Sequence, residues 1–424
     1  MNGTIHTGAR GASGTAVAVL WLAAFLACLP VAQLVAGGSG ETTRRDWSSA
    51  DFGEIAAAAR GTAVRFYMWG GSDSVNAWVD GYVATEMADR FGVEVVRVPM
   101  DASVFVNRLL TEKQAGQSRG TIDLVWINGE NFRTARQADL LYGPFTQLLP
   151  NYRRYVDPAT AETDAGFPVE GYEAPWGRAQ FNFDVDTARA PDYPTSFAAL
   201  REWVRDHPGR FTYPQPPDFT GSAFIRQAFY AVTGGHEQYL GGFDADLFAR
   251  RAPALWEYLN AIEPYLWQGG ESYPRDLAAL DALFERGAVD FTMSFTQTSA
   301  ASRIANGRYP PSVESFVMAE GSLFNTHFVA IPFNAPNTAG ALVLADFLLS
   351  PEAQLSKNRL ENWGDFTVLA MDRLPQDVRE RFAALDLGDA TVSLSELART
   401  AVPEIPSEYW EALERGWDEQ VRLR

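Results

Sequence analysis

Between residues 62 and 132 the chain alternates short apolar runs with amphipathic stretches. The apolar runs at residues 63–69, 93–98 and 122–127 predict three strands. Between them, residues 75–91 and 102–114 repeat their apolar positions every three or four residues, which predicts two helices. A β-α-β-α-β order predicts a parallel sheet with crossover helices, and therefore an α/β fold.

Two of the predicted strands end in unusual loops. The first loop consists of Trp69, Gly70, Gly71, Ser72 and Asp73, and the second contains Trp126, Asn128, Gly129, Glu130 and Asn131. Ligands of parallel sheets bind beyond the carboxyl ends of the strands, where glycines allow close approach to the backbone and the next helix offers free N–H groups. Turns and helix caps use the same residue types. Because two such loops share one sheet edge, they predict a binding site.

Four later segments carry further candidate residues. Residues 211–222 predict a strand, a proline-rich loop and a helix start that contains Asp218, Phe219, Thr220 and Ser222. A strand at residues 291–295 contains Ser294 and leads into Thr296. A strand at residues 324–332 carries Asn325 and His327. Residues 172–183, with Trp176 and Gln180, combine a proline and a glycine with an alternating pattern, which predicts a crossing between two lobes.

The composition excludes several functions. The 424 residues include 53 acidic and 35 basic side chains, so the net charge of −18 argues against nucleic-acid binding. Only Lys113 and Lys357 are lysines, and neither ends a phosphate-binding Gly-x-x-x-x-Gly-Lys motif. The four histidines are scattered, and Cys28 is the only cysteine, so no local zinc motif and no disulfide are expected. The sequence predicts no cofactor and no bound metal.

No catalytic arrangement is evident in the sequence. Residues 116–120 match the Gly-x-Ser-x-Gly pattern of hydrolases, but a helix precedes them and a strand follows, which is the reverse of the required context. Instead, aromatic residues gather near the polar loop ends: Trp69, Trp126, Trp176, Phe219, Trp267 and Trp363. Together with Glu130, Glu173 and Asp218 they suit a pocket for an organic cation, which aromatic faces and carboxylates both attract.

The N-terminus has the features of an export signal. An apolar run at residues 15–36 follows a short start with one basic side chain, Arg10, and precedes the small residues 37–40. We therefore expect residues 1–38 to be a signal peptide and residues 39–60 to be a linker. Two alternatives stay open, because the run is long enough to span a bilayer and Cys28 follows a small residue as at a lipidation site.

Four segments resemble the extracytoplasmic solute-binding proteins of ATP-binding-cassette importers. Residues 69–71, 123–132 and 170–180 resemble a YnjB-type subgroup, while residues 334–354, which end in Ser-Pro-Glu-Ala-Gln, resemble the wider family. The resemblance extends from about residue 62 to the C-terminus. It implies a type II periplasmic-binding fold of two α/β lobes joined by two crossing strands.

The resemblance also implies an organisation and a function. Lobe 1 would comprise residues 61–175 and 330–375, lobe 2 residues 176–329, and residues 376–424 would form helices that pack on the lobes. The expected function is capture of a small, thiamine-like or polyamine-like solute between the lobes. We expect a monomer outside the cytoplasm that delivers the solute to a permease driven by a separate ATPase. The alternatives are a membrane-anchored sensory or scaffold protein and a secreted enzyme on the same scaffold.

Overall fold

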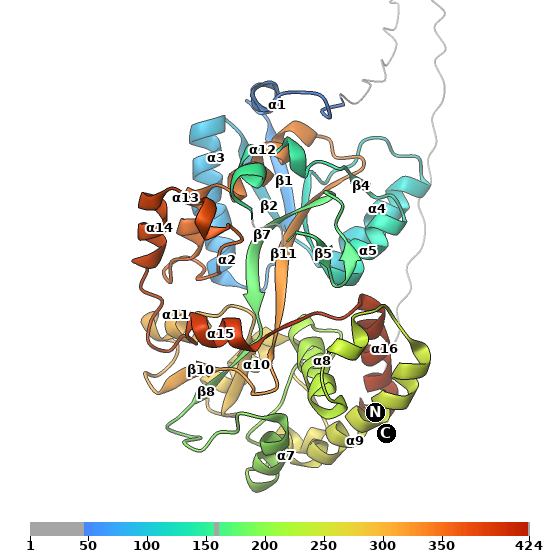
Figure 1. Cartoon of the computed structure of the whole chain (residues 1–424), viewed down its shortest axis with the longest axis vertical. Helices are drawn as coiled ribbons and strands as arrows, with labels where there is room; N and C mark the ends of the chain where they lie inside the picture. Colours follow the sequence, from blue (N-terminus) through green and yellow to red (C-terminus); the bar gives the residue numbers. More distant parts are fainter. Residues whose placement is uncertain (1–45, 157–160, 423–424) are drawn as a thin grey trace, which may run out of the picture. The chain divides into compact units, whose positions relative to one another are not determined.

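The computed structural model describes residues 46–156 and 161–422, and all of them belong to one compact unit that begins at Asp46. The signal peptide and the lipidation site expected from the sequence lie outside the described residues. In the part of the chain that is described, no helix has the length and apolar character needed to cross a membrane. The elements are arranged around two β-sheets, which define lobe 1 and lobe 2 (Figure 1).

Lobe 1 is built on the larger sheet. Its strands run in the order β12-β11-β3-β1-β2, and β4 and β7 both pair with β11. Strand β1 is parallel to β2 and β3, as the sequence predicts, whereas β11 is antiparallel to β3. The bounds are β1 (Ala63–Met68), β2 (Glu94–Pro99), β3 (Leu124–Ile127), β4 (Leu141–Tyr142), β7 (Glu173–Gln180), β11 (Ser322–Pro332) and β12 (Ala401–Pro403). A separate hairpin pairs β5 (Thr163–Asp164) with β6 (Phe167–Pro168).

Helices cover both faces of this sheet, because its strands alternate apolar residues between two cores. Phe66 and Val329 point into one core, while Tyr67 and Phe328 point into the other. The first core is covered by α1 (Phe52–Ala59), α2 (Asp73–Ala77), α3 (Ala84–Phe91), α6 (Pro150–Tyr155), α12 (Thr338–Leu348), α13 (Pro351–Lys357) and α14 (Gln376–Ala383). The second is covered by α4 (Ala102–Gln114) and α5 (Gly129–Gln137).

Lobe 2 contains an antiparallel sheet of three strands, ordered β10-β8-β9, and one large core. The strands are β8 (Asn182–Asp186), β9 (Phe291–Ser294) and β10 (Val313–Phe316). The core is closed by α7 (Phe197–Asp206), α8 (Phe219–Thr233), α9 (Ala245–Ile262), α10 (Leu277–Glu285), α11 (Ser299–Ala305) and α16 (Ser407–Trp417). Side chains of Ser196, Asp244 and Asp276 accept the first N–H bonds of α7, α9 and α10, which fixes where these helices begin.

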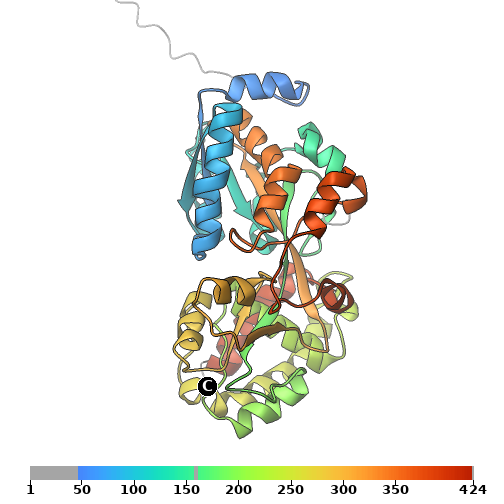
Figure 2. The ribbon, with the colours of Figure 1, turned by 90° about the vertical axis from the view of Figure 1, so that its left-hand side faces the viewer.

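Strands β7 and β11 connect the lobes. They are paired from Gln180 and Phe324 at one end to Glu173 and Ala330 at the other, and Figures 1 and 2 show them running side by side. A third connection follows α14, because α14 packs in a lobe 1 core whereas α16 packs in the lobe 2 core. This connection includes α15 (Leu394–Thr400). The residue boundaries of the lobes given above stay a prediction.

One expected element is wrong. Residues 211–213 form no strand, although their composition suggests one. The Phe211 carbonyl accepts the N–H of Trp267, and the N–H of Gln215 reaches the Pro274 carbonyl, so both groups bond to loops. Pro214, Pro216 and Pro217 have no N–H to donate, and this segment therefore cannot extend a ladder.

Candidate functional site

The carboxyl ends of β1 and β3 bring the two early loops together. These strands are adjacent and parallel, so Trp69 and Asn128 follow them at the same sheet edge. The ring of Trp69 meets that of Trp126 edge to face, with 6.4 Å between centroids. Trp69 is 42% exposed, which is unusual for a large aromatic side chain.

The loop after β1 shapes a platform under Trp69. A Cβ on Gly71 would lie 2.3 Å from the Trp69 ring, so the indole can fold over this residue only because it is glycine. Ser72 caps α2 by accepting the N–H of Val75, and the Gly70 carbonyl accepts the side-chain amide of Asn76. Ser72 and Gly70 therefore build the turn, while Asp73 is exposed in the first turn of α2.

The loop after β3 fastens the sheet edge to the crossing strand. Asn128 Oδ1 accepts from the Trp126 indole at 2.9 Å, and its amide nitrogen donates to the Thr326 carbonyl. Gly129 has a φ of 58°, and its N–H donates to the carboxylate of Asp164. Asn131 is half-buried at the start of α5. These contacts make the loop after β3 a fixed part of lobe 1.

Trp176 does not line an open surface. It is fully buried, with Trp126 and Trp363 edge to face against it at 5.0 and 5.1 Å. Trp176 packs in the lobe 1 core and supports Trp126 from behind, and a contact between its side chain and a solute stays a prediction.

The start of α8 carries an exposed aromatic residue of lobe 2, Phe219, and Phe243 is another. Phe219 is 41% exposed and packs against Phe295 at 4.9 Å and Trp410 at 6.3 Å. Asp218 has a structural role, since it accepts N–H bonds from Thr220, Gly221 and Leu277. Burial raises the pKa of Asp218, and the three N–H bonds oppose that rise.

Most of the predicted hydroxyl residues face the interior of lobe 2. Thr220, Ser222 and Ser294 are buried. Ser222 donates to Glu414 and accepts from Arg226, while Ser294 accepts the N–H of Thr296 in a local turn. These bonds satisfy the hydroxyls internally.

The crossing strands hold Gln180, Asn325 and His327. The Gln180 amide donates to the Leu397 carbonyl, so this side chain ties β7 to α15. His327 Nε2 lies 3.4 Å from Asp365, and its ring stacks on Trp363. Among the described residues, the buried amide oxygen and nitrogen of Asn325 have no hydrogen-bond partner.

A second group of charged residues, which the sequence did not single out, surrounds Glu130. Arg133 on α5 pairs with Glu408 and Glu411 on α16, and Arg226 on α8 pairs with Glu404. Burial raises the pKa of Glu130, and the negative charge of Glu411 raises it further. Burial also raises the pKa of Glu414 to about 7. These residues are far apart in the sequence, and no local motif marks them.

Glu173 is another candidate that lies in the interior of lobe 1. The sequence suggested that Glu173 could attract a cation, but it is fully buried in lobe 1, and burial together with the nearby Asp164 raises its pKa well above the usual range. A protonated carboxyl in that position offers no charge to a solute. Of the three acidic residues proposed for the pocket, Glu130 alone remains available, because Asp218 caps α8.

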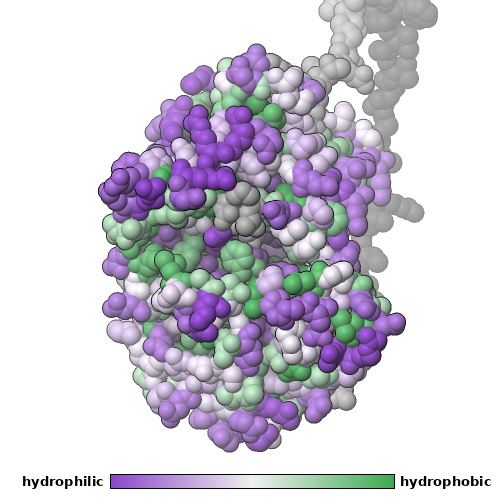
Figure 3. Space-filling view, in the orientation of Figure 1, coloured by the Kyte–Doolittle hydropathy of each residue, from purple (hydrophilic) through white to green (hydrophobic). Residues whose placement is uncertain are grey.

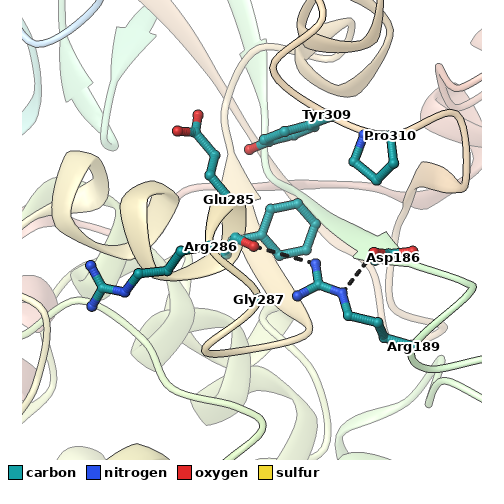
Figure 4. Close-up of a pocket in the computed structure, with 8 residues that line it drawn as sticks. Asp186, Arg189, Glu285, Arg286, Gly287, Tyr309 and Pro310 are labelled. Atoms are coloured by element: carbon teal, nitrogen blue, oxygen red, sulfur yellow. Dashed lines mark hydrogen bonds and ion pairs between the residues drawn. The ribbon is translucent and has the colours of Figure 1, made fainter.

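One surface hollow of about 260 Å³ lies elsewhere, in lobe 2 (Figure 4). Arg189 lines it, and its guanidinium is already bonded to Asp186 and to the carbonyls of Phe284 and Val289. No residue of the two early loops lines this hollow. Among the described residues, no group of histidine, cysteine or acidic side chains is arranged to hold a metal ion.

Two α/β lobes joined by crossing strands are the architecture of a solute-binding protein, and the comparisons agree. The chain belongs to the bacterial extracellular solute-binding protein family, whose model matches residues 82–367. The protein YnjB of Escherichia coli K12 is 40% identical over 336 residues, covering 78% of this chain and 86% of YnjB. This family consists of solute-binding proteins, not enzymes.

Solved structures with a similar fold include a periplasmic binding protein and an ABC transporter protein. The periplasmic binding protein AfuA of Actinobacillus pleuropneumoniae, solved with fructose 6-phosphate, matches with a TM-score of 0.61 at 14% identity over 86% of this chain and 99% of its own. A putative spermidine/putrescine ABC transporter protein of Listeria monocytogenes matches with 0.58 at 16% identity, over 84% and 98%. At these identities the likeness shows the two-lobed fold alone.

Proposed function

We propose that this protein captures a small organic cation between its lobes and delivers it to a membrane permease. The observation that carries the proposal is the exposure of one aromatic ring from each lobe, Trp69 and Phe219, at the loops where this fold binds its ligands. Binding free energy from contacts with both lobes favours a closed state. In Figure 3, hydrophobic residues gather along the line where the two lobes meet.

The charged groups favour a cation over an anion. The named structural neighbours include a fructose 6-phosphate complex and a putative polyamine transporter, so the fold is compatible with either charge. Near Phe219, the guanidinium groups of Arg133 and Arg226 are already engaged by glutamates. An anion would need donors that are not engaged in this way, whereas the half-exposed Glu408 and Glu411 share the single charge of Arg133 and so leave a net negative charge.

Membership of the solute-binding family supports a transport role, and we propose that role together with its details. The protein would act outside the cytoplasm as a monomer, with residues 1–38 as its export signal. A permease would recognise the closed form, and a separate ATPase would supply energy. A cation stacked on an aromatic face contributes about 0.5–2 kcal/mol per contact, so two rings together contribute about 1–4 kcal/mol.

A thermal-shift screen tests the proposal. The panel contains spermidine, putrescine, choline and thiamine as cations, and fructose 6-phosphate, citrate and sulfate as anions. A solute at 100 times its Kd should add about 2.7 kcal/mol of stability, which appears as a clear rise in Tm. We expect at least one cation to raise the Tm and the compound to remain unchanged. A rise caused by anions alone would contradict the proposed charge.

A further inference from the structure

The C-terminal helix α16 touches lobe 1 through two ion pairs. Arg133 on α5 contacts Glu408 at 3.1 Å and also contacts Glu411, and these glutamates lie one helical turn apart on α16. The Arg133 side chain is 14% exposed, while the glutamates are 40% and 43% exposed. A guanidinium is suited to this arrangement, because its donors can hold two carboxylates at once.

These ion pairs join elements that belong to different lobes. Phe132 and Ala135, on either side of Arg133, pack in a core of lobe 1. Tyr409 and Leu413, on the same helix as the glutamates, pack in the core of lobe 2. The pairs therefore form only while α5 and α16 are together, and separation of the lobes would break both.

A backbone contact beside the ion pairs is equally close. A Cβ on Gly129, at the first position of α5, would lie 2.7 Å from the Trp410 ring of α16. Glycine is needed here both for this approach and for the positive φ of 58°. The backbone of α5 thus packs directly against the Trp410 ring of α16, next to the ion pairs.

Each helix is held firmly by its own lobe. On α16, the Trp410 indole donates to the Ile405 carbonyl at 2.9 Å, and the Trp417 indole donates to Tyr213 at 3.0 Å. On the other side, Phe132 and Ala135 bury α5 in a core of lobe 1. We therefore expect each helix to move with its own lobe. Separation of the lobes would then break the ion pairs between the helices.

We propose that Arg133, Glu408 and Glu411 form a latch that holds the lobes together in the absence of solute. This proposal rests on the proposed function in one respect: both assume that the two lobes move relative to each other. The latch increases the population of the closed form in the absence of solute. The apparent affinity for the solute is therefore higher than it would be without the latch. The latch also makes α16, which lies outside the matched residues 82–367, part of the closing machinery.

Small-angle X-ray scattering of the solute-free full chain tests the latch. Arg133→Glu should increase the radius of gyration, because two attractions become repulsions across the lobe boundary. The triple variant that adds Glu408→Arg and Glu411→Arg should restore the native value. Raising the salt concentration to 0.5 M should shift the native protein toward the variant, since exposed ion pairs are screened.

The matched control is Arg136→Glu, one turn further along α5. Arg136 is equally buried, at 15% exposure, but its partner Glu170 precedes β7 within lobe 1. This variant should leave the radius of gyration unchanged. A native radius in folded Arg133→Glu protein, or failure of the charge swap to restore it, would overturn the latch; Arg133→Gln provides the same test if Arg133→Glu does not fold.

The same variants separate the latch from the proposed function. If a solute is known, Arg133→Gln should weaken its binding by about three- to tenfold while Trp69 remains in place. If no cation binds the native protein, the proposed function fails, but the scattering comparison still decides the latch because it requires no solute.

Discussion

At the scale of single residues, Trp69 and Trp176 show what a sequence leaves undecided. Trp69 directly follows β1 and Trp176 lies within β7, and the sequence marks both as candidate ligand contacts. Trp69 is 42% exposed, whereas Trp176 is fully buried against Phe66, Trp126 and Trp363. Burial depends on which distant segments cover a residue, and Trp363 lies far along the chain. Only the fold separates the two roles.

The two tryptophans should respond differently to truncation. Trp69→Ala should weaken cation binding about tenfold and change the free energy of unfolding by less than about 1 kcal/mol. Trp176→Ala should lower that free energy by about 3–5 kcal/mol, because it opens a cavity in the aromatic core. Calorimetric titration and urea unfolding measure these quantities. Equal destabilisation by both substitutions would show that Trp69 is part of the core.

Asp164 should make stability depend on pH. Burial raises its folded-state pKa to about 8, well above its usual value near 4. The protonated form is the one that folding favours, so its stabilisation is complete below pH 4 and is lost as the pH rises through 8. The loss is at most about 1.4 kcal/mol per pH unit. Asp164→Asn keeps an acceptor for the Gly129 N–H and has no proton to lose.

We therefore expect the Tm of the native protein to fall between pH 5 and 8 and the fall to be smaller in Asp164→Asn. Asp89→Asn, at an exposed position on α3, serves as the control and should follow the native curve. Parallel curves for the native protein and Asp164→Asn would refute the assignment. Glu414 titrates in the same direction, with its pKa raised to about 7, so a residual fall is expected.

At the scale of elements, β1, β2 and β3 were predictable because each is a short run of apolar positions between helix and turn signals, whereas β4 and β12, with two and three residues, are too short to show such a pattern. Strand β7 was predictable as a crossing from its proline and glycine. The role of Asp218 was not, because a helix cap and a ligand-binding carboxylate use the same residue type. Arg133 and Glu411 are separated by 278 positions, and nothing local connects them.

Gly177 is the position in β7 that is least tolerant of a side chain. A Cβ there would lie 2.2 Å from a carboxylate oxygen of Asp365, 2.8 Å from the His327 ring and 2.8 Å from Lys357 Nζ. Lys357 and Asp365 are completely buried and 2.6 Å apart. Moving either side chain away from a new Cβ would leave a buried charge unpaired.

Gly177→Ala should therefore lower the free energy of unfolding by about 1–3 kcal/mol, measured by urea denaturation. Gly81→Ala is the matched control, because nothing lies within 4 Å of its Cβ and its φ is not positive. That variant should be as stable as the native protein or slightly more stable. A neutral Gly177→Ala would mean that the Asp365 and Lys357 pair can move aside.

At the scale of the whole molecule, the family and the two-lobed architecture were predictable from the sequence, and the comparisons confirm both. Family motifs lie in contiguous segments, which a sequence displays directly. The connection from α14 through α15 to α16 was expected only as helices that pack on the lobes. Its importance lies in contacts with α5 and α8, which arise from folding.

Export is a property of the whole chain and has a direct test. If residues 1–38 are a signal peptide, protein recovered from the cell envelope should begin near residue 39, as determined by N-terminal sequencing. An intact residue 1 in the membrane fraction would indicate a retained anchor, and a lipidated start at Cys28 would indicate a lipoprotein.

The central claim is that the lobes hold a small cation between Trp69 and Phe219. The most direct measurement is isothermal titration calorimetry with the cation that gives the largest thermal shift, comparing the native protein with a variant carrying Trp69→Ala and Phe219→Ala. We predict one binding site per chain in the native protein and affinity at least tenfold weaker in the variant. Unchanged affinity in the variant, or binding of anions alone, would contradict the account.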